Sequence, residues 1–531
     1  KPLDAASISR HCTGISRGNK LTDRSDQTVR AIVIVGGGTA GWMTAAALAR
    51  KLAGTGSTIR LIESAEIGTV GVGEATLPQI RDFNRMLEID EAELMARTSA
   101  TIKLGIEFRD WGRAGDHYIH PFGVHGEPVG PADFHHYWAR QNAAGGAGDF
   151  GAYCLPIVAA REGRFDRPPS DPQSPLQAYS YAFQFDASLY AAFLADYATG
   201  RGVERIEGKV IAVDSDGESG FIRSVTLESG QRIEGELFVD CSGFRGLLIE
   251  QEMATGYADW SEWLPCNRAF AVPCAITGPV GPYTRSTARP AGWQWRIPLQ
   301  HRIGNGHVYC DRYCSDQDAL DLLMTNLEGE PIADPKQLFF RTGKRRKLWN
   351  RNCVAIGLSG GFLEPLESTS IDLIQSGILN LLALFPETHC AAADVDEYNR
   401  LMDLEYDRIR DFLMLHYVLN QREEPFWRDM REMAWPDSLS AKIEAFQRRA
   451  IVPHYDHGLF QPASWLSVFI GQNLLPESWD PRADAMAADD LAARLQHIRR
   501  SVEDGAGRMS GHLAFIEKYR ATFAGSQAGA A

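Results

Sequence analysis

Hydrophobic residues follow two different periods along the chain. In the first part they form short runs bounded by glycine and polar turns, as at residues 31–35 and 57–62, which is typical of buried strands. Between these runs, residues 42–52 repeat apolar positions at helical spacing. The sequence therefore predicts a strand, helix and strand in succession, a βαβ unit that opens an α/β sheet.

A second group of predicted strands lies in the middle of the chain. Residues 209–213 and 221–227 alternate in polarity on either side of a turn, and 232–239 follows another turn. This pattern predicts an antiparallel meander that leads into a buried strand at 237–239. That strand and a later one at 354–356 run toward Gly243 and Gly357, at the sheet edge where ligands of α/β folds lie.

The last third of the chain is predicted to be mostly helix, because apolar residues recur at helical spacing over 371–385 and 395–419. We therefore expect an α/β module with insertions at 31–390 and a mostly helical module at 391–525. Residues 1–30 are polar and lack an apolar signal segment, so a flexible tail or an expression leader is expected there. Residues 526–531, rich in Gly and Ala, are expected to form a disordered tail.

Composition restricts the partners. The 531 residues include 54 Lys and Arg against 68 Asp and Glu, and the net charge of -14 argues against nucleic acid and against an anionic membrane surface. No apolar run is long enough to span a membrane. The nine cysteines are scattered, and Cys310 and Cys314 have no second Cys/His pair beside them. We therefore expect no metal site, reduced thiols and a cytoplasmic location.

The turn after the first predicted strand has the spacing of a dinucleotide-binding motif. Its backbone N–H groups and the following helix N-terminus can approach a pyrophosphate, and Glu63 ends the second strand where such folds place a ribose-binding acid. A purely structural glycine turn is the alternative. The candidate cofactor contacts in this turn are Gly36, Gly38, Thr39, Ala40 and Gly41.

FAD is favoured over NAD as the cofactor. The glycine ends of the strands at 237–239 and 354–356 are of flavin-enzyme type, and Gly357 is a further candidate contact. No second glycine-rich strand, turn and helix is present for NAD(P)H. The reducing equivalents are then expected from a separate NAD(P)H-dependent flavin reductase that supplies FADH2.

Four ordered motifs resemble the flavin-dependent tryptophan halogenases. They are 34–43, 71–76, 293–298 and 362–369, and the Trp-x-Trp-x-Ile-Pro element at 293–298 is the most specific. In that family, reduced FAD and oxygen convert chloride or bromide into hypohalous acid, which travels through the protein to a lysine beside an electron-rich aromatic substrate. The second motif adds further cofactor contacts: Gly73, Glu74 and Ala75.

The resemblance assigns two catalytic roles. Lys103 matches the lysine that receives the oxidised halogen, and Glu367 matches the glutamate that polarises the oxidant and accepts the ring proton. Within a strand at 101–108, Lys103 would point away from the apolar side chains, so the pattern alone predicts a solvated lysine. Whether its ammonium binds hypohalous acid or its neutral amine forms a haloamine stays open. For Glu367, a simple charge effect at a helix N-terminus is the alternative.

The halide site is expected at the start of the helix predicted for 371–385. Thr369 and Asp372 have the spacing of a capping box, so the N–H groups of Thr369 and Ser370 would lie at the positive end of the helix, which suits chloride or bromide. An ordinary helix cap is the alternative. Family members commonly carry Gly where this chain has Ser370.

The resemblance also outlines a tunnel and a substrate site. Trp293, Trp295 and Pro298 are expected to wall the route from flavin to substrate, with core packing as the alternative. His120 and Phe122 match a stretch that sandwiches an indole ring. Trp465 is a third expected substrate contact, but the lid region at 451–475 differs from that of enzymes acting on free tryptophan. An indole or another small aromatic compound is therefore the expected substrate.

Together these features predict an α/β fold, with an FAD-binding Rossmann-like (βαβ) module, antiparallel β insertions and a largely helical module that covers the substrate. The predicted function is flavin-dependent halogenation of an indole or tryptophan-like ring. A flavin-dependent aromatic hydroxylase and a flavin-binding protein without turnover are the alternatives. A homodimer stays open.

Overall fold

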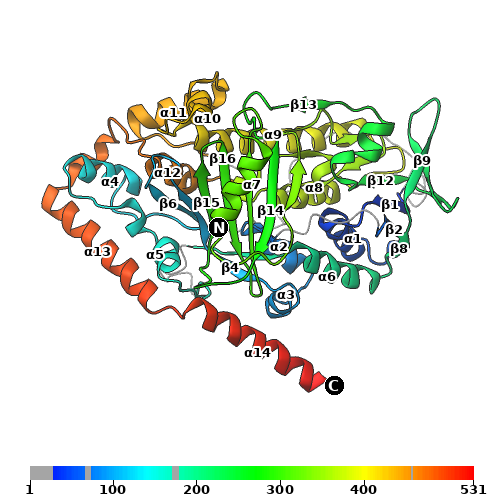
Figure 1. Ribbon diagram of the computed structural model, residues 1–531, viewed down its shortest axis with the longest axis horizontal. Coiled ribbons are helices and arrows are strands. Elements are labelled where there is room, and N and C mark those ends of the chain that lie inside the picture. The colour runs from blue at the N-terminus through cyan, green and yellow to red at the C-terminus, as the bar shows by residue number, and fades with distance from the viewer. Residues whose placement is uncertain (1–27, 66–72, 170–178, 456–457, 531) are drawn as a thin grey trace, which may run out of the picture.

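A mainly parallel six-stranded sheet forms the cofactor-binding end of the protein. The computed structural model describes residues 28–65, 73–169, 179–455 and 458–530. The sheet has the order β20-β21-β12-β1-β2-β8, and α1 (Thr39–Lys51) connects the neighbouring parallel strands β1 and β2, which confirms the predicted βαβ unit (Figure 1). Its strands are β1 (Ala31–Val35), β2 (Thr58–Glu63), β8 (Glu204–Glu207), β12 (Leu237–Asp240), β20 (Trp349–Asn350) and β21 (Cys353–Ala355).

The predicted meander packs beside this sheet. Its strands β9 (Val210–Ser215), β10 (Ile222–Leu227) and β11 (Arg232–Glu234) pair antiparallel, and their apolar residues share a core with the six-stranded sheet. The buried strand predicted at 237–239 is confirmed as β12. The chain leaves the meander after β11 and joins the parallel sheet as β12, which pairs with β1.

A seven-stranded sheet occupies the middle of the molecule, with the order β18-β14-β17-β16-β15-β5-β6 (Figure 1). On β16, Trp293, Trp295 and Ile297 alternate with Gln294 and Arg296, so the two sets point to opposite faces. The strands are β5 (Gly105–Arg109), β6 (His117–Pro121), β14 (Arg268–Cys274), β15 (Thr284–Arg289), β16 (Gly292–Pro298), β17 (Ile303–Tyr309) and β18 (Lys336–Phe339).

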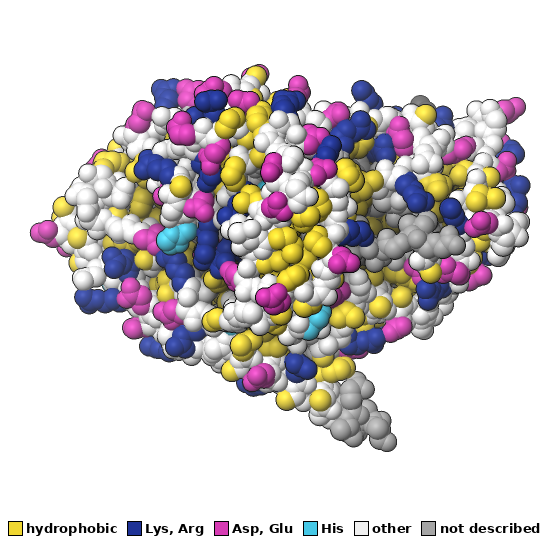
Figure 2. Space-filling model, viewed as in Figure 1, with side chains coloured by type: hydrophobic (Ala, Val, Ile, Leu, Met, Phe, Trp, Pro, Cys, Tyr) yellow, Lys and Arg dark blue, Asp and Glu magenta, His cyan; other side chains and the backbone are white. Residues whose placement is uncertain are grey.

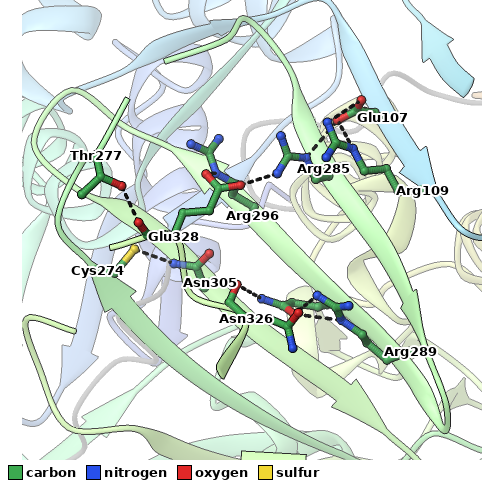
Figure 3. A network of polar contacts seen from close by, with 11 residues as sticks. Glu107, Arg109, Cys274, Thr277, Arg285, Arg289, Arg296, Asn305, Asn326 and Glu328 are labelled. Atoms are coloured by element: carbon green, nitrogen blue, oxygen red, sulfur yellow. Dashed lines mark hydrogen bonds and ion pairs between the residues drawn. The ribbon is translucent and has the colours of Figure 1, made fainter. Parts of the chain in front are cut away.

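Polar residues connect neighbouring strands on the face of this sheet opposite the tryptophans (Figure 3). Arg285 of β15 donates to Glu107 of β5 at 2.9 Å, and the Arg296 guanidinium of β16 lies 2.8 Å from Glu328. Arg285 also donates to Glu328, so one carboxylate joins two strands. Because the Glu328 side chain is 45% exposed, its ion pairs contribute little to stability.

Two small sheets complete the β structure. One has the order β3-β7-β4, with strands β3 (Gly73–Ala75), β7 (Ala182–Asp186) and β4 (Thr101–Lys103). The other has the order β13-β19-β22, with strands β13 (Tyr257–Asp259), β19 (Gly343–Arg345) and β22 (Gly361–Phe362). The single strand expected at 101–108 is therefore wrong. At Leu104, which donates its N–H to Pro282, the chain passes from the small sheet into β5 of the seven-stranded sheet.

The last third is helical, as predicted. The helices expected at 371–385 and 395–419 are α8 (Ser370–Ala383) and α9 (Ala392–Val418), and they are followed by α10 (Pro425–Glu432), α11 (Asp437–Arg449), α12 (Pro462–Gly471), α13 (Ala488–Gly507) and α14 (His512–Ala530). Disorder was expected after Gly525, but α14 continues to Ala530. Helices α13 and α14 run along the lower edge of the view in Figure 1.

Six more helices are placed between the strands of the first 330 residues. They are α2 (Gln79–Met86), α3 (Glu91–Arg97), α4 (Phe134–Ala143), α5 (Leu155–Arg161), α6 (Ala187–Thr199) and α7 (Asp316–Thr325).

Within the described ranges, no helix is both long and apolar enough to cross a membrane. Acidic and basic side chains are interspersed over the face shown in Figure 2. Of the tail predicted at 1–30, residues 1–27 lie outside the described residues. Val29 is described and is fully buried.

Candidate functional site

A cavity of about 660 Å³ opens at the carboxyl ends of the parallel strands. Nearly all of the predicted cofactor residues line it, together with the loop after β12: Gly36, Gly38, Thr39, Ala40, Glu63, Gly73, Glu74, Ala75 and Gly357, with Cys241, Ser242, Gly243, Phe244 and Arg245. This volume lies in the range of cofactor pockets. The glycine turn forms one part of the wall, and large apolar side chains such as Trp295, Phe340 and Phe362 form much of the rest. Arg205 and Lys209 also line the cavity, and no sequence motif had pointed to them.

The glycine turn leaves room for a phosphate group. A side chain at Gly36, whose φ is +116°, would collide with the Cys241 carbonyl, and one at Gly41 would collide with the Gly36 carbonyl. Gly41 therefore serves close packing and does not line the cavity. At Gly38 a Cβ atom would meet no protein atom within 4 Å, because this position faces open space at the N-terminus of α1. No acidic residue stands in the first turn of α1, so its free N–H groups suit an anion.

Two glutamates border the cavity. Glu63 ends β2, where Trp42 Nε1 donates to it at 3.3 Å and Arg205 Nε at 2.5 Å, so its carboxylate is held in place at the expected ribose position. Burial raises the pKa of Glu74 to about 7. The chemistry of this wall, with its open glycine turn, anchored acid and unpaired helix N–H groups, fits the dinucleotide part of FAD.

The cavity continues inward to the start of α8. Trp295, Ile297, Leu366, Ser368 and Ser370 line this inner end. Trp293 and Pro298, predicted as tunnel wall, stand behind it: the Trp293 ring centroid is 6.1 Å from that of Trp295, and the Pro298 carbonyl accepts a hydrogen bond from Thr101.

The predicted capping box at the start of α8 is wrong. Thr369 has helical dihedral angles and makes no side-chain cap bond, because Ser368, at φ +60°, makes the sharp turn before it. Its hydroxyl is buried and has no hydrogen-bond partner among the described residues. Beside the cavity-lining Ser370 and the free N–H groups of the helix, this hydroxyl offers a donor to a halide ion.

Lys103 is fully buried, so the solvated lysine predicted from the pattern alone is wrong. Segments distant in sequence cover it: Nζ donates to the Thr76 carbonyl at 3.0 Å and to Ser368 Oγ at 2.8 Å, and it lies 5.2 Å from the centre of the Phe122 ring. Burial lowers the pKa of the Lys103 ammonium to about 7, although the charge of Glu367 acts in the opposite direction. The Ser368 hydroxyl therefore connects Lys103 to the inner end of the cavity.

Glu367 lies between two histidines and is also fully buried. His120 Nδ1 donates to Oε2 at 2.8 Å, and His416 Nε2 lies 2.8 Å from Oε1 in a short but poorly aligned contact. Burial alone would raise the pKa of the Glu367 carboxyl, but the two imidazoles outweigh it and hold that pKa at about 2. The result is a buried carboxylate with one oxygen, Oε1, that has no aligned donor.

Aromatic side chains surround this pair. The His120 ring lies 5.5 Å from Phe412 and 6.1 Å from Phe460, and these two phenylalanines stack at 3.8 Å. Trp465 contacts Phe412 edge to face at 5.2 Å and lies behind it. Of the three predicted substrate contacts, His120 therefore contacts Glu367 and Phe122 contacts Lys103, whereas Trp465 packs against Phe412.

The sequence did not identify several residues of this arrangement. His416 contacts Glu367, and Tyr118 lies 3.0 Å from the other nitrogen of the His416 ring. Phe412 and His416 are four positions apart on α9, a spacing that places both on one helix face, but nothing in the sequence shows which face meets Glu367.

Comparisons with known proteins agree with this geometry. The family model described as tryptophan halogenase matches residues 31–488. A tryptophan 6-halogenase of Streptomyces toxytricini is 37% identical over 492 residues, which cover 87% of this chain and 92% of the relative. Solved flavin-dependent halogenases from Brevundimonas sp. BAL3 and Xanthomonas campestris have TM-scores of 0.89 each and identities of 45% and 47%, and they cover 92% and 93% of this chain and 99% of their own.

Proposed function

Because this chain belongs to the tryptophan halogenase family and is a flavin-dependent enzyme, we propose that Lys103 and Glu367 halogenate an indole-type ring. The contact between Lys103 Nζ and Ser368 Oγ carries this proposal, since Ser368 lines the inner end of the cofactor cavity. An oxidised halogen that reaches Ser368 is within one contact of the lysine.

The cofactor cavity would hold FAD through the turn 36–40, Glu63 and the loop at 241–245. Reduced FAD, with oxygen, supplies the oxidising power that converts a halide ion into hypohalous acid. Thr369 and Ser370 would hold the halide beside the cavity. Trp295 and Leu366 narrow the inner end, which keeps the organic substrate away from the cofactor.

Lys103 and Glu367 divide the reaction between them. With a pKa near 7, the Lys103 side chain is partly neutral at physiological pH, so it can bind the oxidised halogen as an amine or hydrogen-bond it as an ammonium. Glu367 stays ionised throughout that range, and its oxygen Oε1 is available to accept the ring proton. The halogen is thus delivered from one side chain and the proton removed by another.

The proposed substrate is an indole or a related electron-rich small aromatic compound other than free tryptophan. Flat rings at His120, Phe122, Phe412 and Phe460 favour a flat ring as ligand. The segment between α11 and α12, which contributes Phe460, lacks the Tyr/Glu/Phe/Trp-rich character expected of a lid for the amino-acid group. Residues 456–457 of this segment lie outside the described residues.

We also propose that a separate NAD(P)H-dependent reductase delivers FADH2 by diffusion. A reducing, cytoplasmic compartment would suit the eight described cysteines, none of which is in a disulfide.

A substrate panel tests the proposal. Purified protein with FAD, a flavin reductase, NADH, oxygen and bromide is incubated with indole, substituted indoles, tryptophan and phenols, and the products are analysed by mass spectrometry. We expect an indole product in which bromine replaces hydrogen, formed faster than bromotryptophan. A product that gains only oxygen would point to a hydroxylase, and a clear preference for free tryptophan would refute the proposed substrate class.

A further inference from the structure

Glu364 is a buried acid that the reaction described above does not use. It precedes the short 3-10 turn Pro365–Glu367 and is 1% exposed. Its oxygen Oε2 accepts two hydrogen bonds, from Trp293 Nε1 at 2.9 Å and from the Tyr417 hydroxyl at 2.5 Å. Its other oxygen, Oε1, is buried and has no partner among the described residues.

Glu364 and Glu367 attach the same turn to the same two parts of the fold. On α9, Glu364 binds Tyr417 and Glu367 contacts the preceding residue, His416. On the seven-stranded sheet, Glu364 binds Trp293 of β16 and Glu367 binds His120 of β6. The turn is therefore held at two points on a helix and at two points on a sheet.

The backbone directly after this turn needs such support. Ser368 adopts a left-handed conformation with φ +60°, which is unfavourable for a residue other than glycine. The same residue places its hydroxyl 2.8 Å from Lys103 Nζ. Displacing reacting groups by about 1 Å can reduce a rate by about 10²-fold, so whatever holds this turn affects the reaction.

We propose that Glu364 is a positioning residue of the halogenation reaction: it fixes the turn Pro365–Glu367 between Trp293 and Tyr417, so that Glu367 and Ser368 face Lys103. This inference rests on the proposed roles of Lys103 and Glu367. Besides its predicted place in the tunnel wall, Trp293 then has a second role, because it donates the hydrogen bond that connects β16 to the turn Pro365–Glu367 through Glu364.

The charge state of Glu364 agrees with this role. Burial raises the pKa of Glu364 to about 7, while the hydrogen bonds from Tyr417 and Trp293 act in the opposite direction. The titratable groups that face it are Tyr417, Cys266 and Cys310, and burial raises the pKa of each of them, so all three are neutral near pH 7. A carboxyl group among neutral neighbours can keep its proton on Oε1 and accept both hydrogen bonds on Oε2.

Three variants and one control test the proposal. Glu364→Gln keeps an oxygen acceptor for both donors, Glu364→Leu removes the acceptor, and Tyr417→Phe removes one donor. Tyr153→Phe is the control, because Tyr153 is a buried tyrosine that donates to the Ala147 carbonyl away from the site. The readouts are the ratio of halogenated product to hydrogen peroxide, the KM for the aromatic substrate and the Kd for FAD.

We expect Glu364→Leu to lower the product-to-peroxide ratio by about 30-fold and Tyr417→Phe by about threefold, with the Kd for FAD and the KM changed less than about twofold. Glu364→Gln should keep at least about half of the wild-type ratio.

An unchanged ratio in Glu364→Leu, or an effect of Tyr417→Phe no larger than that of Tyr153→Phe, would overturn the proposal. A Glu364→Gln variant as poor as Glu364→Leu would also overturn it, since Glu364 would then be transferring a proton. If Glu364→Leu does not fold, the two tyrosine variants decide.

A stability measurement separates this inference from the proposed function. A carboxyl whose pKa is raised in the folded state loses its stabilising contribution as pH rises from about 4.5 to about 7. Glu364→Gln should therefore raise the melting temperature relative to wild type more at pH 8 than at pH 5. Wild-type protein that forms no halogenated product would refute the proposed function. If the pH-dependent difference in melting temperature is nevertheless present, Glu364 is still shown to be buried and neutral near pH 7. Absence of the difference counts against Glu364 itself.

Discussion

The cofactor cavity and the proposed catalytic pair, Lys103 and Glu367, are adjacent but are built in opposite ways. The cavity is open, with Gly38 facing free space, and both the glycine turn and apolar side chains such as Trp295 and Phe362 line it. Lys103 and Glu367, in contrast, are fully buried and are covered by side chains from distant segments, among them Ser368, His120 and His416. One region is shaped to receive a large ligand, and the other is held rigid before any ligand arrives.

This contrast indicates where mutations should act. Changes at the catalytic pair should stop halogenation and leave cofactor binding intact, because no residue of the pair lines the cavity. A side chain added at Gly38, which would meet no protein atom within 4 Å, should weaken cofactor binding and leave the folded protein intact. Any variant that fails to separate the two effects would argue against the division.

The largest effect is expected for Lys103→Ala. It should lower the rate of product formation by about 10³-fold or more while flavin oxidation continues, so that hydrogen peroxide replaces the halogenated product. Product by mass spectrometry and peroxide by a coupled assay measure this split. Lys51→Ala, at an exposed lysine in the last turn of α1, is the control. Retention of the wild-type rate in Lys103→Ala would remove the assigned role.

Glu367→Gln should lower kcat by about 10²-fold, since an amide of the same shape cannot accept the ring proton. The imidazoles keep the pKa of Glu367 at about 2 against the effect of burial, so the wild-type carboxylate stays ionised over any practical assay range. The defect should accordingly be equal at pH 6 and pH 8. Steady-state kinetics at the two values measure it, and a defect that disappears at either pH would contradict the role.

A smaller effect is expected for Gly38→Ala. Its Cβ meets no protein atom but would enter the space assigned to the cofactor phosphates, so the Kd for FAD should rise about tenfold with an unchanged melting temperature of the cofactor-free protein. Gly217→Ala, also without neighbours within 4 Å but in a surface turn, is the matched control. Equal Kd values for the two variants would place the cofactor elsewhere.

The smallest effect concerns stability. Burial lowers the pKa of Lys103 to about 7 from its usual value near 10.5, so the folded state binds fewer protons than the unfolded state between these values. Stability from this group therefore rises with pH across that range, and its cost is fully present below about pH 7. Lys103→Met should raise the melting temperature by a few degrees at pH 6.5 and by less at pH 9.5. A constant difference would mean that Lys103 is not desolvated.

The sequence predicted the cofactor region better than the catalytic region, for a physical reason. A glycine turn between a strand and a helix fixes its own geometry, so Gly36, Gly38 and Glu63 could be placed from local pattern. The burial of Lys103 depends on Thr76, Phe122 and Ser368, which only the tertiary fold brings together.

The same limit explains the errors at the start of α8 and in the strand at 101–108. Thr369 has the residue type of a cap, but it follows the left-handed Ser368, has helical dihedral angles itself and makes no side-chain cap bond. The break at Leu104 follows from pairing with β7 on one side and β6 on the other, which no local alternation of polar and apolar residues reveals.

The Ser368 hydroxyl has a consequence for inhibitor design. It is reachable from the cofactor cavity and touches Lys103 directly. A flavin-like compound carrying a short arm with a hydrogen-bond donor would compete with Lys103 for the Ser368 hydroxyl oxygen. Such a compound would inhibit the halogenation of every aromatic substrate equally, and its structure would not need to resemble any of these substrates.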